Sequence, residues 1–453
     1  MMDAACNDRR PDTAGFAAVA SDGAIVPQAV GERAAGIRFQ VSKPVLAGRE
    51  CEYVRDALDS GWISSNGSYV GRFERSVSSF VGVAHGMAVS SGTAALHLAC
   101  LAMELGPRQD VIVPALTYVA SANAVRYCGG RPLFADCDPY TWNVTRASIE
   151  AAWTPRTVGV VLVHLYGLPA PVEEIAALCR ERGAWLIEDC AECFGGMVGG
   201  RQVGTFGDAA AFSFFGNKII STGEGGMVLV HDPRRRERVA MLRDQGMDAA
   251  RRYWHPITGY NYRMTNVAAA IGLGQSEMAD YHLAERRRIA LRYLEKLAPL
   301  QESGMLRLPL EPADTRNVYW LFSVVLTAGG ERRREHIRQT LLAAHGIETR
   351  PFFVPMHKLP MFRTKRHFPH SEFVGEHGIN LPTYSGLDTK DIDEICAALS
   401  DIIVRESGGA IAAEKAGEMW LSSVVGEAVQ PIVASHGRTD MVATAVGPET
   451  RNG

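Results

Sequence analysis

The chain has 453 residues, of which 47% are apolar and 21% charged, a balance that is typical of globular domains and excludes wholesale disorder. Its formal net charge of −3 gives no overall field that would favour nucleic acid or an anionic membrane. No apolar run reaches the roughly 20 residues that span a bilayer, and nine cysteines without a recognisable export signal indicate reduced thiols. We therefore expect a cytoplasmic protein.

Strand-like and helix-like segments alternate from Phe39 onward. The expected strands are short and apolar: residues 87–90, 111–114, 131–135, 158–164, 185–188, 209–214 and 227–230. The expected helices lie between them, at residues 94–105, 117–128, 147–153 and 172–181. This alternation predicts a large α/β domain with a mostly parallel sheet, which we place at residues 38–270.

A smaller α+β domain is predicted at residues 271–405. Its expected elements are one long helix at 266–297, strands at 318–327 and 347–353, and helices at 335–345 and 391–404. Residues 1–37 are rich in Ala, Gly, Asp and Pro and read as a mobile leader. Residues 406–453 form a tail of unknown role, with one apolar patch at 420–425.

Three arginine-rich runs lie at residues 234–238, 285–288 and 331–335. One interpretation is a patch that binds phosphate or a nucleotide. Because each run contains or adjoins glutamate, solvated helix faces are the favoured interpretation.

The most informative residue is Lys218, the only lysine between Lys43 and Lys296. It follows an apolar strand and precedes a glycine-rich stretch, residues 223–226. Arginine cannot lose its proton and attack a carbonyl to form a Schiff base, whereas lysine can. Lys218 is therefore a candidate nucleophile, the alternative being a solvated loop lysine.

Asp189 ends another predicted strand, at the sheet edge where ligands of parallel α/β proteins bind. An aspartate that pairs with the pyridine nitrogen of pyridoxal phosphate keeps this nitrogen protonated, and the ring can then accept electrons. The alternative role is the N-cap of a following helix.

Candidate phosphate ligands follow a third strand. The Ser91–Thr93 stretch offers backbone N–H groups, a hydroxyl and a helix N-terminus, although the same pattern is common in plain N-caps. Ser213 adds a second hydroxyl, and Tyr118 is an aromatic residue that can stack on a flat ring. Taken alone, Tyr118 is better interpreted as a core or rim aromatic.

Cys190 and Cys193 form a Cys-x-x-Cys pattern. A zinc site would need a second ligand pair at suitable spacing, and the sequence contains none. We therefore expect no metal and interpret both thiols as packing residues.

Five blocks in fixed order carry a resemblance: residues 91–98, 114–121, 188–192, 204–226 and 259–264. Together they resemble the DegT/DnrJ/EryC1/StrS family of pyridoxal phosphate (PLP)-dependent sugar aminotransferases, over about residues 39–405. The resemblance implies PLP-dependent fold type I, the aspartate aminotransferase-like fold, with a mostly parallel seven-stranded sheet and a smaller C-terminal domain. Blocks 212–218 and 253–266 most resemble the branch that makes GDP-perosamine.

The resemblance also implies roles around the cofactor ring. Lys218 is the lysine that forms the Schiff base and moves the proton, and Asp189 pairs with the pyridine nitrogen. Glu192 matches the family's Gln or Glu beside the phenolic oxygen, and Tyr118 matches the stacking aromatic. A related dehydratase branch has His in place of Lys218, so the lysine favours amino transfer.

For the phosphate, the resemblance implies Gly92, Thr93 and Ser213 as ligands. Asn261 matches a residue that reaches the phosphate of a neighbouring subunit, which implies a homodimer with shared active sites. Trp62 and Ser64 match a loop near the sugar, and we add Tyr319 and His357 as candidate substrate contacts.

The implied reaction moves the amino group of L-glutamate to a keto sugar nucleotide, with C4 of GDP-4-keto-6-deoxy-D-mannose as the expected acceptor. The open alternatives are a 3-keto sugar, a UDP- or dTDP-linked sugar, or a cyclitol ketone. A regulator that merely binds PLP or a nucleotide sugar is the non-enzymatic alternative, although a binder needs neither Lys218 nor Asp189.

Overall fold

A computed structural model of the chain describes residues 36–407. The leader predicted at residues 1–37 lies almost wholly outside the described residues, as does the tail after residue 407 with its apolar patch at 420–425. No helix in the described part of the chain is long and apolar enough to cross a membrane.

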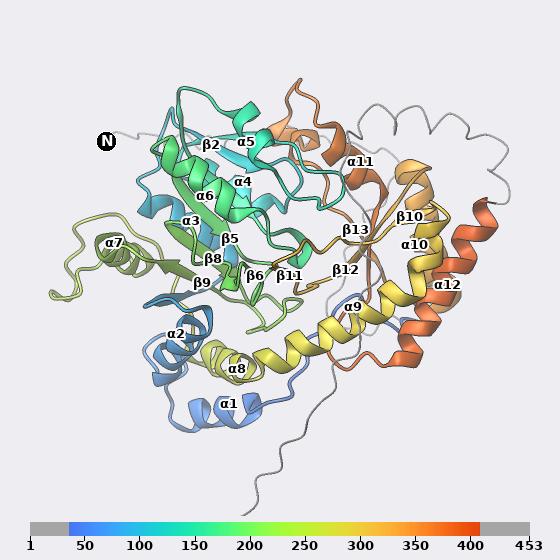
Figure 1. The fold of residues 1–453 in the computed structure, drawn as a ribbon. Coiled ribbons are helices and arrows are strands. Elements are labelled where there is room, and N and C mark those ends of the chain that lie inside the picture. The colour runs from blue at the N-terminus through green and yellow to red at the C-terminus, as the bar shows by residue number, and fades with distance from the viewer. Residues whose placement is uncertain (1–35, 408–453) are drawn as a thin grey trace, which may run out of the picture. The chain divides into compact units, whose positions relative to one another are not determined.

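The largest element is a seven-stranded sheet (Figure 1). Its strands, in spatial order, are β1 (Gly86–Val89), β9 (Gly226–Val230), β8 (Ala209–Ser213), β5 (Trp185–Asp189), β4 (Thr157–Val163), β2 (Asp110–Pro114) and β3 (Arg131–Ala135). Strand β9 runs antiparallel to both of its neighbours, and the other pairings are parallel. The mostly parallel seven-stranded sheet is thus confirmed.

Alternate residues of each central strand pack on opposite faces of this sheet, as the pleat requires. Val111 and Ile187 join one core cluster, whereas their neighbours Ile112 and Leu186 join another. The first face is covered by α3 (Gly92–Ala102), α4 (Val119–Tyr127) and α7 (Pro233–Arg243). The second is covered in part by α5 (Arg146–Ala152) and α6 (Val172–Glu181). Both faces are buried, which explains why these strands are mainly apolar.

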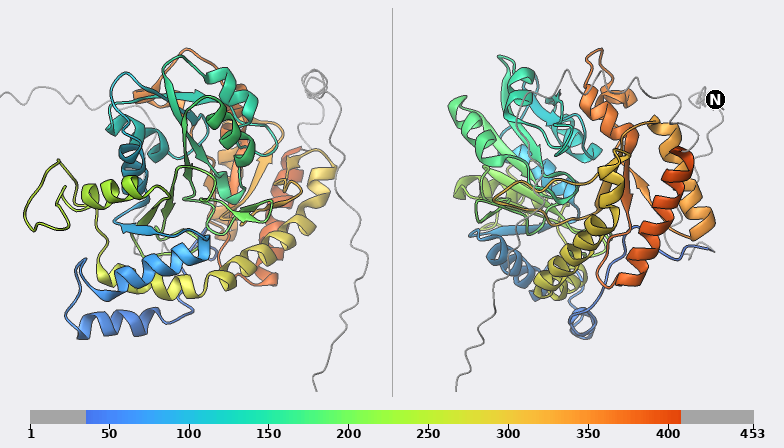
Figure 2. Two further views of the ribbon diagram at one scale, coloured as in Figure 1. Left: turned by 60° about the vertical axis from the view of Figure 1, so that its left-hand side comes forward. Right: turned by 45° about the vertical axis from the view of Figure 1, so that its right-hand side comes forward.

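Three more helices pack together beside strand β1: α1 (Glu50–Asp59), α2 (Ser68–Val81) and α8 (Asn266–Glu277). The prediction of one long helix at 266–297 is wrong, because the chain leaves helical geometry at Met278 (φ −101°, ψ 12°). The next helix, α9 (Ala279–Glu302), packs against the smaller sheet at β10 instead (Figure 2). The two helices therefore bury their apolar residues against different partners.

The smaller sheet has four antiparallel strands in the order β10 (Leu306–Arg307), β12 (Phe322–Leu326), β14 (Gly378–Leu381) and β13 (Arg350–Pro351). Helices α10 (Gly330–His345) and α11 (Pro369–His377) pack against it. A three-stranded sheet joins β11 (Thr315–Arg316), β6 (Met197–Val198) and β7 (Arg201–Gln202). Single 3₁₀ turns are η1 (Leu165–Gly167), η2 (Met356–Lys358) and η3 (Pro360–Phe362).

Residues up to Ser400 belong to one compact unit, and a second unit begins at Asp401, within helix α12 (Thr389–Ser407). The α+β content after residue 300 agrees with the predicted fold class. The predicted domain boundaries at 38, 270 and 405 stay predictions.

The strand predicted at 318–327 begins later than expected, at Phe322. Tyr319 has a φ of 47°, a left-handed conformation that a β-strand does not accommodate. Its segment folds closely around Gly167, where an added Cβ would lie 2.6 Å from the backbone nitrogen of Trp320.

The arginine-rich runs are engaged by protein groups. Arg287 pairs with Glu311 at 2.8 Å, and Arg235 pairs with Asp208 at 2.7 Å. Arg286 and Arg334 are buried and donate to backbone carbonyl oxygens. The favoured interpretation of solvated helix faces is therefore only partly correct, since these two arginines hold the fold together from inside.

Candidate active site

The carboxyl ends of β1, β8 and β5 bring the predicted site residues to one edge of the large sheet, with the antiparallel strand β9 between β1 and β8. In the register of the sheet, Val89 of β1 pairs with Gly226 of β9, which also pairs with Ser213 of β8. Strand β5 ends beside β8 at Asp189. Parallel α/β sheets place their ligands at this edge.

Asp189 is buried, and its carboxylate is held from two sides. Ser121 Oγ donates to Oδ2 at 2.7 Å, and the Ala191 backbone N–H donates to Oδ1 at 3.2 Å. Residues 190–193 form turns rather than a helix, so the alternative of a helix N-cap does not apply. Burial raises the pKa of Asp189 despite the Ser121 bond, which leaves this carboxylate in need of a cation.

Lys218 lies in a closed loop between β8 and β9. The loop is tied at its base, where the Phe214 N–H donates to Gly225 O and the Thr222 N–H donates to Phe214 O. The Lys218 N–H donates to Phe215 O at 2.9 Å. The side chain is therefore carried by a backbone with little freedom, and it is half-buried rather than fully solvated.

The amine of Lys218 shares its surroundings with two carboxylates. Burial lowers the pKa of Lys218, the charges of Glu192 and Asp189 oppose this effect, and the charge of Arg350 adds to it. Burial raises the pKa of Glu192 to about 7, against the pull of Lys218. A lysine that can lose its proton thus lies beside an acid that can keep one.

A cradle for an anion lies at the N-terminus of α3, next to Ser213. The Ser91 hydroxyl caps this helix by accepting from the Ala94 N–H at 3.1 Å. A Cβ added to Gly92 would lie 2.7 Å from Ser213 Cβ, so only glycine allows this approach. The N–H groups of Gly92 and Thr93 point out of the first helical turn, where they have no acceptor within residues 36–407.

These residues fit a phosphorylated pyridine. The helix N-terminus and Ser213 suit a phosphate, and the buried Asp189 suits a protonated ring nitrogen. Tyr118, 56% exposed at the start of α4, leaves an aromatic face open. Its ring centroid lies 5.7 Å from that of Phe353, which follows β13 of the smaller sheet.

Three further predicted contacts, Asn261, Trp62 and Ser64, lie at the surface. Asn261 is exposed and forms a bridge with Asp244, next to the end of β1, where the Ser90 N–H donates to Tyr262 O. Trp62 and Ser64 are exposed in the loop before α2. Their backbone carbonyls accept from Asn266, so a buried asparagine shapes this loop.

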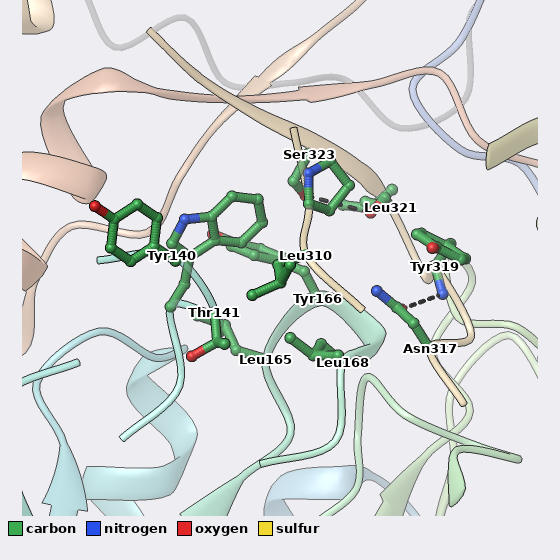
Figure 3. Close-up of a pocket in the computed structure, with 12 residues that line it drawn as sticks. Tyr140, Thr141, Leu165, Tyr166, Leu168, Leu310, Asn317, Tyr319, Leu321 and Ser323 are labelled. Carbon is green, nitrogen blue, oxygen red and sulfur yellow. Dashed lines mark hydrogen bonds between the residues drawn. The ribbon is translucent and has the colours of Figure 1, made fainter. Parts of the chain in front are cut away.

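Tyr319 and His357 are both buried and engaged elsewhere. The Tyr319 hydroxyl donates to Glu311 at 3.4 Å, and His357 Nε2 lies 3.0 Å from a Glu372 oxygen. Tyr319 also lines a small cavity with Tyr166 and Trp142, shown in Figure 3. The cavity holds about 10 Å³, the room of one water molecule. Both residues stay predictions as substrate contacts, without support from this geometry.

Three residues of the site were not assigned from the sequence. Ser121 donates to Asp189, and the Tyr166 N–H donates to Glu192 Oε2 at 2.8 Å. Trp320 covers the amine of Lys218, with Nζ 3.7 Å from the centroid of its ring. Ser121 is part of the block at residues 114–121 that resembles the family. Tyr166 and Trp320 carry no local sequence signal, because contacts between distant segments bring them to the site.

One buried group has the atoms of a metal site: His164, Glu188 and Cys190. Glu188 already accepts from the N–H groups of Gly204, Phe206 and Gly207, and His164 Nε2 lies 3.3 Å from its Oε2. These hydrogen bonds give the group a role in holding the fold, rather than open positions for coordinating a metal ion. Cys193 is buried and donates to Gly167 O, as a packing thiol would.

Comparison with known proteins agrees with this geometry. A GDP-perosamine synthase from Caulobacter vibrioides is 45% identical over 369 residues, which cover 81% of this chain and 99% of that protein. Another from Vibrio cholerae is 42% identical over 364 residues, covering 80% of this chain and 98% of that protein.

The crystal structure of the aminotransferase TlmJ from Streptoalloteichus hindustanus superposes with a TM-score of 0.77 at 31% identity. The match covers 82% of this chain and all of that one. The model of the DegT/DnrJ/EryC1/StrS aminotransferase family matches residues 44–400. The chain is therefore an aminotransferase that belongs to the DegT/DnrJ/EryC1/StrS family.

Proposed function

We propose that this aminotransferase binds PLP through Lys218 and transfers the amino group of L-glutamate to C4 of GDP-4-keto-6-deoxy-D-mannose. The product is GDP-perosamine. The observation that carries the cofactor assignment is the meeting of Lys218, Asp189 and Glu192 beside the anion cradle at Gly92. The acceptor is chosen from the two relatives named as GDP-perosamine synthases.

Each residue has a distinct task in this proposal. When bound, PLP supplies an aldehyde for covalent capture of amines and a ring that accepts electrons. Asp189 keeps the ring nitrogen protonated, and Ser121 holds the Asp189 carboxylate in place. Gly92, Thr93 and Ser213 bind the phosphate, and Tyr118 covers the ring.

Lys218 moves the proton once its amine is free. The amine would take a proton from Cα of the donor as a base and give one back as an acid, while PLP, when bound, would supply the electron-accepting ring. A lowered pKa suits the role of base, because a larger share of the amine is then neutral. Glu192, with a pKa of about 7, can donate a hydrogen bond to the phenolic oxygen.

The acceptor is tested with a panel of keto sugars carried on GDP, UDP and dTDP, with L-glutamate as donor and 2-oxoglutarate release as the readout. We expect turnover with GDP-4-keto-6-deoxy-D-mannose and an amino group at C4 of the product. Good turnover of a UDP-, dTDP- or 3-keto sugar beside none of the GDP sugar would replace this substrate.

Replacing Lys218 tests the catalytic assignment. Lys218→Ala and Lys218→Arg should lower turnover by at least roughly a thousandfold, because neither side chain can move the proton. Lys296→Ala, which removes an amine on α9, is the matched control and should keep full turnover. Purified wild-type protein should be yellow and lose this colour with glutamate; colour that glutamate does not bleach would favour a regulator.

We also propose a homodimer in which Asn261 reaches the partner's phosphate. Large apolar side chains are exposed on two loops near the site, including Trp62 at 58% and Tyr253 at 75%. Exposed apolar side chains of this size are typical of protein interfaces. We propose as well that the chain divides into a domain that binds the cofactor, residues 38–270, and a smaller domain, residues 271–405.

A further inference from the structure

Trp320, which is not among the predicted site residues, lies directly against the amine of Lys218. It follows β11 and precedes β12, and only 4% of its surface is exposed. Lys218 Nζ lies over the indole, 3.7 Å from the ring centroid. The face of an indole attracts an ammonium group, and it does so more strongly where water is excluded.

The edge of the same indole holds the backbone that carries Lys218. Trp320 Nε1–H donates to the carbonyl oxygen of Asn217 at 2.7 Å. The Ser42 hydroxyl donates to the same oxygen at 3.2 Å. One side chain therefore fixes both the amine of Lys218 and the peptide group just before it.

Trp320 is itself held firmly. Arg286 Nη1 donates to its carbonyl oxygen at 2.6 Å, and the Val318 N–H donates to Gly167 O at 3.0 Å. The ring of Tyr166 lies nearly parallel to the indole, at 6.2 Å and 19°. An aromatic surface that is fixed on all sides can set the position of a flexible lysine.

We infer that Trp320 is a positioning residue that holds the free amine of Lys218 whenever this amine is not bonded to the cofactor. The indole face stabilises the ammonium form that arises when Lys218 takes a proton, and the indole N–H keeps the Lys218 backbone in register. The inference rests on the proposed role of Lys218. It adds that Trp320 influences the pH at which Lys218 loses its proton.

The first test follows uptake of PLP by cofactor-free protein, which is independent of turnover. Only the neutral amine attacks the aldehyde, so the pH midpoint of the uptake rate reports the pKa of Lys218. The rate is measured from the growth of visible absorbance between about pH 6 and 10, around the ordinary amine pKa. Trp320→Leu should lower the midpoint by about half a unit to one unit, because the ammonium loses its aromatic partner.

Two further variants separate positioning from mere packing. Trp320→Phe keeps an aromatic face but loses the N–H bond to Asn217, so its midpoint should stay near that of the wild type. Phe322→Leu removes a fully buried aromatic that stacks on Tyr293 instead. It should lower the melting temperature and leave the midpoint unchanged.

The second test uses a single turnover of PLP-loaded protein with glutamate. Loss of the yellow colour should be about tenfold slower in Trp320→Leu and less affected in Trp320→Phe. A Trp320→Leu protein with the wild-type midpoint and rate would overturn the inference, as would an equal midpoint shift in Phe322→Leu. If no keto sugar serves as acceptor, the proposed substrate class is overturned. Both tests of Trp320 can still be interpreted, because neither uses an acceptor.

Discussion

At the scale of single residues, the site depends on how burial changes the proton affinity of its acids and its base. Asp189 and Glu192 are buried and Lys218 is half-buried, and burial disfavours the charged form of each. Hydrogen bonds limit the shifts of the acids: Ser121 and the Ala191 N–H donate to Asp189, and the Tyr166 N–H donates to Glu192. The attraction between Lys218 and the carboxylates limits all three shifts. Of the three, Glu192 has a pKa of about 7, which suits a group that exchanges protons near neutral pH.

Glu192 gives a stability prediction with a definite sign. Its pKa is about 7 in the folded protein and near 4.5 in an exposed chain, so the folded state binds more protons between these values. The unfolding free energy of cofactor-free protein should therefore fall as pH rises through this window, by up to about 3 kcal/mol. Urea unfolding at several pH values measures this trend.

Glu192→Gln should flatten the pH dependence, because the amide has no proton to lose. Glu237→Gln is the matched control, since Glu237 is exposed on α7 and should leave the slope unchanged. A slope as steep in Glu192→Gln as in the wild type would show that another group titrates.

At the scale of elements, loops that join strands to helices hold the functional groups, and their shape depends on a few close contacts. The approach of α3 to β8 needs glycine at position 92. Gly92→Ala would force a Cβ to within 2.7 Å of Ser213 Cβ and push the two phosphate ligands apart. We expect PLP affinity to fall by about tenfold, or about 1.4 kcal/mol.

Absorbance titration of cofactor-free protein with PLP measures this loss. Gly106→Ala is the control, because an added Cβ there meets nothing within 4 Å. Equal PLP affinity in Gly92→Ala and the wild type would show that the phosphate does not bind at the N-terminus of α3.

Glu188 forms a second contact between elements, because its hydrogen bonds join β5 to the loop before β8. Although burial opposes its charge, bonds from His164 and three backbone N–H groups hold its pKa below the ordinary value. The stability it contributes is thus present above the pKa of the unfolded chain and lost as pH falls through the lower folded value.

Glu188→Gln should cost about 3 kcal/mol of unfolding free energy, because an amide cannot accept all of these bonds. Glu181→Gln, at an exposed pair with Arg146, should cost under about 1 kcal/mol. Urea unfolding near neutral pH compares the two, and a similar small loss in both would show that the loop is held by other contacts.

At the scale of the whole molecule, the prediction concerns two copies. Sedimentation should give twice the chain mass of 49.2 kDa. If Asn261 serves the partner's site, mixing Lys218→Ala and Asn261→Ala proteins restores one intact site in each mixed dimer. Since half of the dimers are mixed and one of two sites is intact in each, about a quarter of wild-type activity should return. If activity does not rise although subunit exchange is proven, Asn261 serves the active site of its own subunit.

The sequence by itself determined the fold class, the main strands and the central residues of the site. Strands β3 and β5 lie almost where their apolar runs predict, because strands buried on both faces must be apolar throughout. Lys218 and Asp189 were recognisable because a scarce lysine follows one strand and an aspartate ends another, and parallel strands end at the same edge of a sheet.

Only the tertiary structure decided where elements break and what covers the site. Helices α8 and α9 share one helical pattern in sequence, yet the chain turns at Met278 because each helix packs against a different partner. Trp320 lies about a hundred residues after Lys218 and reaches it only because its segment wraps Gly167. Contacts between distant segments depend on packing, which local periodicity does not encode.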